Sequence, residues 1–143
     1  FLQCKTPKTD DQVRKIGQIP AIEFHYWKLI MVGGDTIVTP PDGREIYMIL
    51  TPTDHESGAL KGHAGCNGLG GDYKIEGRMI KFQPITTRMF CDVQMEVENR
   101  FTKMLTAADN YRIKNRTLEL YRGDELLGTF ETNADHGLYR SPK

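Results

Sequence analysis

Short apolar stretches separated by turn signals follow one another along most of this chain, and this pattern restricts its fold more than any other feature. Residues 46–50 (IYMIL) follow the turn signal Pro40-Pro41-Asp42-Gly43 after two further residues. Residues 73–76 and 79–85 alternate around Gly77-Arg78, which places Ile80 and Phe82 on one face. Because consecutive short stretches joined by tight turns are typical of hairpins, the sequence predicts an antiparallel sheet.

One segment has an uninterrupted helical periodicity. An apolar stripe recurs at steps of four, three, one and three, and predicts an amphipathic helix over residues 93–108 with Phe101 at its centre. The stripe consists of Val97, Phe101, Met104, Leu105 and Ala108. Strand-like stretches resume from Tyr111 to Phe130. The predicted fold is therefore β-rich α+β, an antiparallel half-open barrel or strongly curled sheet with one packed α-helix.

The length of 143 residues suits one domain. Residues 1–21 are mostly polar, and Gly17 and Pro20 interrupt the regular spacing of their few aliphatic side chains. We therefore expect an N-terminal arm or tether there. The domain is expected over 22–132, opening with a strand from Phe24 to Ile30, and a polar tail over 133–143.

Lys plus Arg and Asp plus Glu both number 19, so no net positive charge favours nucleic acid. The longest apolar run, 46–50, is far shorter than the roughly 20 residues of a membrane-spanning helix. The chain begins at Phe1 rather than Met, which suggests that an upstream signal or other segment has been removed. Membrane contact is expected only through a lipid anchor at the N-terminus. Cys4 could carry that lipid or be an ordinary thiol.

Glycines are concentrated in residues 62–71 (GHAGCNGLGG). This cluster lacks the Lys-Ser/Thr of a phosphate-binding loop and precedes a strand rather than a helix. We therefore interpret Gly62, Gly65 and Gly71 as permitting tight turns and close strand approach. The side chain of Asn67 is expected to bond nearby backbone.

Together with three further features, this segment resembles the signature of the META/HslJ family of small bacterial envelope proteins. Those features are Trp27-Lys28-Leu29, then Ile85-Thr86-Thr87-Arg88-Met89-Phe90-Cys91, and a helix containing Glu96. The resemblance covers about residues 24–132. It implies a half-open β-barrel with a packed helix, location in the periplasm or attached to the outer membrane, a signal or lipoprotein segment, and a loose association with stress tolerance. It supplies no catalytic residues.

Within the matched motif, Cys66 and Cys91 could be joined by a disulfide in an oxidising envelope, or could remain two buried thiols. With His63 they could instead form a redox or metal site, although a fourth metal ligand is missing. Arg88 could pair with Glu96 or Glu98, or bind an anion. The first hypothesis is a non-enzymatic envelope module that uses no cofactor or metal and binds an unknown envelope protein or small ligand. The alternative is a thiol-redox or metal-binding protein.

Overall fold

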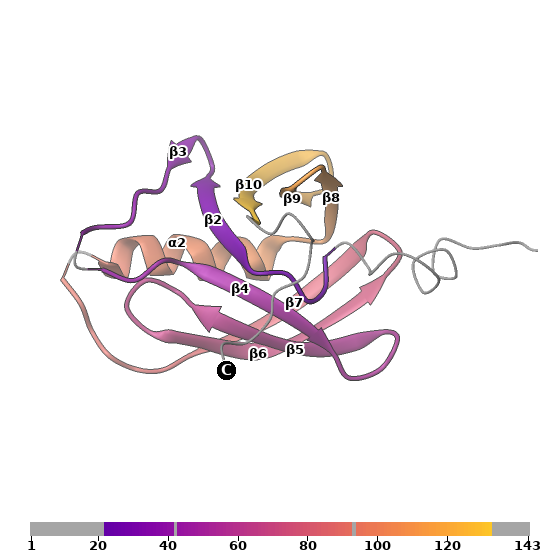
Figure 1. Cartoon of the computed structure of the whole chain (residues 1–143), viewed down its shortest axis with the longest axis horizontal. Helices are drawn as coiled ribbons and strands as arrows, with labels where there is room; N and C mark the ends of the chain where they lie inside the picture. The colour runs from indigo at the N-terminus through magenta and orange to yellow at the C-terminus, as the bar shows by residue number, and fades with distance from the viewer. Residues whose placement is uncertain (1–21, 42, 93, 133–143) are drawn as a thin grey trace, which may run out of the picture.

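The computed structural model describes residues 22–41, 43–92 and 94–132. The expected arm, with Cys4, and the expected tail lie outside these residues. The described part forms strands joined mostly by short turns, with a longer connection over 37–46 and a single helix before the last three strands (Figure 1). The elements are β2 (Trp27–Val32), β3 (Asp35–Thr36), β4 (Tyr47–Pro52), β5 (Ser57–His63), β6 (Gly68–Glu76), β7 (Met79–Thr86), α2 (Gln94–Ala107), β8 (Asn110–Lys114), β9 (Thr117–Arg122) and β10 (Glu125–Glu131).

The strands form a nine-stranded antiparallel sheet that curls into a ring. Its order is β10-β9-β8-β7-β6-β5-β4-β2-β3, and a further pairing between β10 and β2 brings the two ends together. Strand pairing around the ring is least extensive between β7 and β8, which share the single register pair Met79↔Asn110. The predicted curled sheet with one helix is confirmed, and the β10–β2 pairing adds its closure.

The helix α2 covers the inside of the ring with the predicted apolar stripe. Phe101 and Leu105 are fully buried, Met104 and Ala108 are buried, and Val97 is partly buried against the same core. The ring of Phe101 lies 6.0 Å from that of Phe130 on β10, in a tilted arrangement. The helix thus packs its apolar stripe against β10, one end of the sheet order.

Two glycines of the cluster are required by close backbone approach. A Cβ at Gly62 would collide with the carbonyl oxygen of Tyr47 on β4, and one at Gly71 would collide with that of Gln83 on β7. Gly71 also has a φ of 122°, which side chains rarely tolerate. The structural interpretation of these glycines is confirmed.

The first strand begins later than predicted. Phe24 has a φ of 71° and lies in a turn, and strand geometry starts only at Trp27. Trp27 is buried, and its indole Nε1 donates a hydrogen bond to the carbonyl oxygen of Ile22 at 2.9 Å. Ile22 is itself fully buried, so the core of the described residues begins at that residue. In the described part of the chain, no helix has the length and apolar character needed to cross a membrane.

Candidate functional site

A buried carboxylate on α2 holds the loop that follows β5. Glu98 is only 3% exposed, and its Oε1 accepts hydrogen bonds from the backbone N–H groups of Cys66 (3.0 Å) and Asn67 (2.7 Å). Its Oε2 accepts a third bond from Asn67 Nδ2 at 2.8 Å. Burying a carboxylate is costly unless donors replace its water. Here three donors from one loop replace that water, so the loop and the helix are fixed to each other.

The side chain of Asn67 extends this contact to the segment between β7 and α2. Its Oδ1 accepts from the backbone N–H of Met89 (2.7 Å) and the hydroxyl of Thr87 (2.8 Å). Its Nδ2 donates to the carbonyl oxygen of Met89 (3.1 Å) as well as to Glu98. All four hydrogen-bonding positions of the amide are therefore used. The expectation that Asn67 bonds nearby backbone is confirmed.

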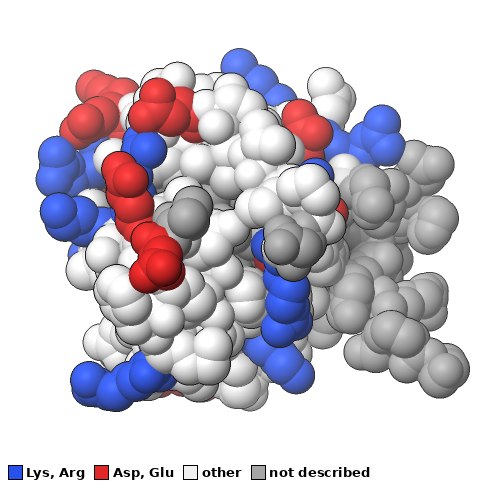
Figure 2. Space-filling view, turned by 90° about the vertical axis from the view of Figure 1, so that its left-hand side faces the viewer, with Lys and Arg blue, Asp and Glu red and all other residues white. Residues whose placement is uncertain are grey.

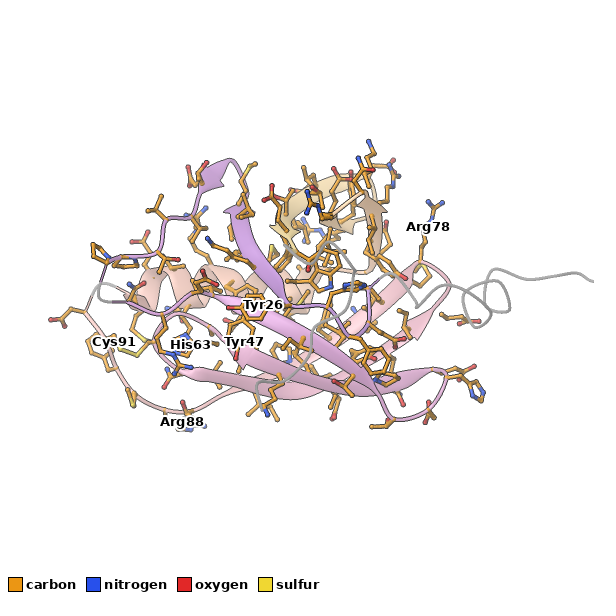
Figure 3. All side chains as sticks on the ribbon, in the orientation of Figure 1. Tyr26, Tyr47, His63, Arg78, Arg88 and Cys91 are labelled. Carbon is orange, nitrogen blue, oxygen red and sulfur yellow. A yellow bond between two sulfur atoms is a disulfide. The ribbon has the colours of Figure 1, made fainter. Side chains whose placement is uncertain are left out.

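Cys66 and Cys91 form a disulfide, with their Cα atoms 5.9 Å apart. The two residues are 25 positions apart in sequence. The bond joins the loop after β5 to the segment before α2, at the left end of the molecule in Figure 3. Of the alternatives open from the sequence, the disulfide is therefore the one that the structure contains.

We call residues 87–92 the connector. Its backbone is held by Asn67 and by the disulfide, and the backbone N–H of Thr87 donates to the carbonyl oxygen of Gly68 at 3.3 Å. Its apolar side chains are nevertheless exposed to solvent: Met89 is 61% exposed and Phe90 is 78% exposed. Ile85, just before it on β7, is 66% exposed. A fixed backbone thus displays exposed apolar side chains.

Figure 2 views the molecule from this end. A broad area without charged side chains faces the viewer, and charged side chains of both signs, Lys and Arg as well as Asp and Glu, lie along its edges. Scattered exposed apolar residues are normal on soluble proteins. The unusual feature here is that two adjacent ones belong to a loop whose backbone is bonded to Asn67 through both the N–H and the carbonyl oxygen of Met89.

Arg88 does not make the ion pair expected from the sequence. It is exposed and points away from the body of the protein in Figure 3, and no ion pair joins it to Glu96 or Glu98 within the described residues. The reason is that Glu98 faces inward to the loop of Cys66 and Asn67. Glu96 lies in the first turn of α2, as expected, but is itself exposed.

His63 lies beside this network without joining the two sulfur atoms in a metal site. It is 4% exposed, and its Nδ1 accepts a hydrogen bond from the N–H of Gly65 at 3.4 Å. Burial lowers the pKa of His63, Arg44 lowers it further and Glu98 opposes the shift. The described residues contain no group of three or more His, Cys, Asp or Glu placed to hold a metal. The disulfide also removes Cys66 and Cys91 as thiolate ligands.

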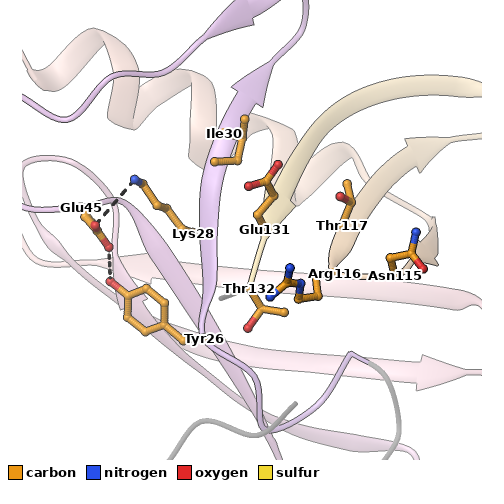
Figure 4. Close-up of a pocket in the computed structure, with 9 residues that line it drawn as sticks. All are labelled: Tyr26, Lys28, Ile30, Glu45, Asn115, Arg116, Thr117, Glu131 and Thr132. Atoms are coloured by element: carbon orange, nitrogen blue, oxygen red, sulfur yellow. Dashed lines mark hydrogen bonds and ion pairs between the residues drawn. The ribbon is translucent and has the colours of Figure 1, made fainter. Parts of the chain in front are cut away.

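A polar groove of about 550 Å³ lies on the outer face of the ring between β2 and the end of β10 (Figure 4). Lys28 and Glu45 form an ion pair there (3.7 Å), and Tyr26 donates a hydrogen bond to Glu45 at 2.7 Å. Arg116 and Glu131 add one charge of each sign. Because opposite charges are interspersed along the groove, it has no strong preference for an anion or a cation.

Sequence analysis missed Glu98 as the organising residue of the site. Charged residues on an amphipathic helix usually belong to its solvent face. The sequence does contain one indication of its burial, which is spacing. Positions 98, 101 and 105 share one helical face, so Glu98 falls within the predicted buried stripe. A charge at such a position is buried only when it has partners.

Comparison with known proteins gives one family match and two similar folds. The META domain model matches residues 20–134. A protein solved by NMR from Burkholderia xenovorans is 19% identical and has a TM-score of 0.61, over 93% of this chain and 95% of that one. A second NMR structure is 20% identical with a TM-score of 0.59, over 78% and 91%. At this identity the likeness shows the fold alone. A search of curated protein sequences gives no significant match.

Proposed function

This chain belongs to the META domain family, and we propose that it is a non-enzymatic contact module of the cell envelope, whose connector meets its binding partner. The observation that carries the proposal is the contrast within the connector. Asn67 bonds both the N–H and the carbonyl oxygen of Met89, while the side chains of Met89 and Phe90 remain exposed. Fixing a loop in advance lowers the entropy lost on binding.

Location in the envelope is supported by the disulfide. Disulfides persist in secreted and periplasmic proteins and are rare in the reducing cytosol. In this protein the bond joins two segments of the site rather than lying at its margin. A role in stress tolerance would follow from holding a partner under conditions that unfold less constrained proteins.

The non-enzymatic character is supported by how the buried ionisable groups are used. The three donors to Glu98 are structural, and Glu23 accepts a hydrogen bond from the hydroxyl of Tyr73 at 2.6 Å. Burial raises the pKa of Tyr73 well above its usual value, and Glu23 raises it further. These groups stabilise the fold. Cys66, only 9% exposed, is also better placed for a structural bond than for redox exchange.

Photo-crosslinking in the native cell tests the proposal. A photoreactive phenylalanine analogue at position 90 should form adducts with another envelope component. The matched control carries the same analogue at Met79, which is 57% exposed and adjoins Arg78, at the opposite end from Cys91 in Figure 3. Equal adduct formation at the two positions would contradict the connector as contact surface.

The same cells test the location. Thiol trapping before lysis should leave Cys66 and Cys91 unlabelled, because they are bonded. Labelling of both cysteines in the native cell would contradict an oxidising compartment.

A further inference from the structure

We propose that the polar groove on the outer face of the ring binds a neutral saccharide. The groove lies between β2 and the end of β10 (Figure 4), and none of its lining residues belongs to the connector. This binding site is therefore independent of the contact role of the connector. Its volume of about 550 Å³ falls within the range of about 300–1,000 Å³ that is usual for small-molecule sites.

The first argument is the balance of charge in the groove. Lys28 forms an ion pair with Glu45 at 3.7 Å, and Glu131 is its register partner across the pairing of β2 with β10. Arg116 adds a second positive charge to the lining. An anionic ligand would meet two carboxylates and a cationic ligand two positive charges, and like charges oppose binding. Because a hydroxyl group both donates and accepts hydrogen bonds, a neutral ligand rich in hydroxyls can use all four side chains.

The second argument is a polar atom that lacks a partner. Thr132 lines the groove and is only 6% exposed, and its hydroxyl oxygen makes no hydrogen bond within the described residues. Buried polar atoms are nearly always hydrogen-bonded, so an exception calls for an explanation. A hydroxyl of a bound ligand would supply the missing partner. Thr117 and Asn115 line the same groove and offer a further hydroxyl and an amide.

The third argument favours a saccharide over an extended peptide. One common mode of peptide binding adds the peptide backbone to a free strand edge. Here β10 pairs with β9 on one edge and with β2 on the other, and β2 pairs with β3 and β4 on its second edge. The groove therefore offers side chains rather than a free strand edge. Carboxylate, amide and hydroxyl side chains suit the hydroxyl groups that surround a sugar ring.

The fourth argument is an aromatic side chain that is held in place. The ring of Tyr26 stacks on that of Tyr47, with centroids 4.3 Å apart and planes inclined by 14°, and its hydroxyl donates to Glu45 at 2.7 Å. Because these contacts fix the side chain in advance, little entropy is lost when a ligand binds. Tyr26 and Ile30 give the groove apolar surface against which the C–H groups of a sugar can pack.

Titration of the full chain, followed by amide-resolved NMR, tests this inference. The neutral probes are maltotriose, cellotriose and the trimer of N-acetylglucosamine. The charged probes are trigalacturonate and the trimer of glucosamine. Wild type should bind at least one neutral probe with a Kd of about 1 mM or lower, and the amide signals of Lys28, Thr117 and Glu131 should shift. Each charged probe should bind at least about tenfold more weakly than that neutral probe.

Two variants locate the site. Thr117→Phe places a large side chain in the groove from the outer face of β9 and should weaken binding at least about tenfold. Tyr26→Ala should weaken it about fivefold, because it removes the aromatic surface. The matched control is Tyr121→Ala. The hydroxyl of Tyr121 also donates to a glutamate, Glu119, at 3.0 Å, but Tyr121 does not line the groove, so this variant should bind like wild type.

Circular dichroism checks that each variant is folded, and Thr117→Phe decides the test if Tyr26→Ala is not. The inference is overturned if none of the neutral probes shifts the groove amides, if a charged probe binds as tightly as the best neutral one, or if folded Thr117→Phe binds like wild type. Equal losses in Tyr26→Ala and Tyr121→Ala would also overturn it. The contact role of the connector is tested separately, by crosslinking at positions 90 and 79.

Discussion

The two halves of the buried face of α2 are held to the sheet by different forces. Toward its C-terminal end, Phe101, Met104 and Leu105 are buried among apolar side chains, and Phe101 lies against Phe130. Toward its N-terminal end, Glu98 is equally buried but surrounded by hydrogen-bond donors from the loop of Cys66 and Asn67. We call these the apolar half and the polar half.

The difference shows which kind of contact stabilises the fold and which kind fixes the orientation of its parts. Apolar burial stabilises the fold without requiring one orientation, because the hydrophobic effect is non-directional. Hydrogen bonds from two adjacent N–H groups to one carboxylate require one geometry. The apolar half therefore stabilises the fold without fixing an orientation, and the polar half determines where the connector lies. Substitutions in each half can separate these two roles.

The largest effect is expected in the apolar half. Phe101→Ala should lower the free energy of unfolding by about 3–5 kcal/mol, because it empties a fully buried aromatic site. Chemical denaturation monitored by circular dichroism measures this loss. A loss under about 1 kcal/mol would mean that the stripe contributes little to the core.

The disulfide, which lies beside the polar half, should contribute almost as much to the free energy of unfolding. Cys66→Ala combined with Cys91→Ala should cost about 3–4 kcal/mol, since it releases a closed loop with a sequence separation of 25. Denaturation of the oxidised protein and of the double variant gives the difference. If the oxidised protein and the double variant unfolded with equal free energy, the bond would not stabilise the protein by restraining its unfolded chain.

Glu98→Gln should have a moderate effect. The amide oxygen can still accept from the N–H groups of Cys66 and Asn67, but an NH2 group then faces Asn67 Nδ2, so donor meets donor. The expected loss is about 1–3 kcal/mol. The control is Glu96→Gln, an exposed position on the same helix, with a change below about 0.5 kcal/mol. Equal effects of the two variants would show that burial of Glu98 is unimportant.

A smaller effect is expected from His63, which borders the polar half. Burial lowers its pKa in the folded state, so below about pH 6.5 the unfolded chain binds more protons than the folded protein. Stability should therefore be complete above that pH and decline as the pH falls toward the folded-state pKa. His63→Gln should reduce the decline, and burial of His25 should account for part of what remains. If wild type and His63→Gln give the same dependence between about pH 7.5 and 5, His63 does not contribute.

The same two halves show what the sequence could predict. The period of Val97, Phe101 and Leu105 is a local signal, and it predicted the helix and its buried face correctly. The strands of the hairpin at Gly77 were predicted by local alternation in the same way. Closure of the ring by β10 and β2 depends on residues about a hundred positions apart, and no local pattern encodes it.

The polar half was predictable only in part. The cysteine pair and the bonding role of Asn67 were suggested by the motif, and both are present. Glu98 was predicted only as one of two residues that could pair with Arg88, and its burial was not predicted, because a charged residue is ordinarily exposed. Its donors come from a loop about thirty residues earlier, so its burial becomes intelligible only once the fold brings that loop to the helix.

Amide hydrogen exchange at Met89 tests most directly the claim that the polar half fixes the connector. Its side chain is 61% exposed, yet its N–H is bonded to Asn67 Oδ1 at 2.7 Å. In the wild type this amide should exchange far more slowly than an unprotected one, and Asn67→Ala should remove the protection while the buried Leu118 amide on β9 stays protected. Rapid exchange at Met89 in the wild type would contradict the account.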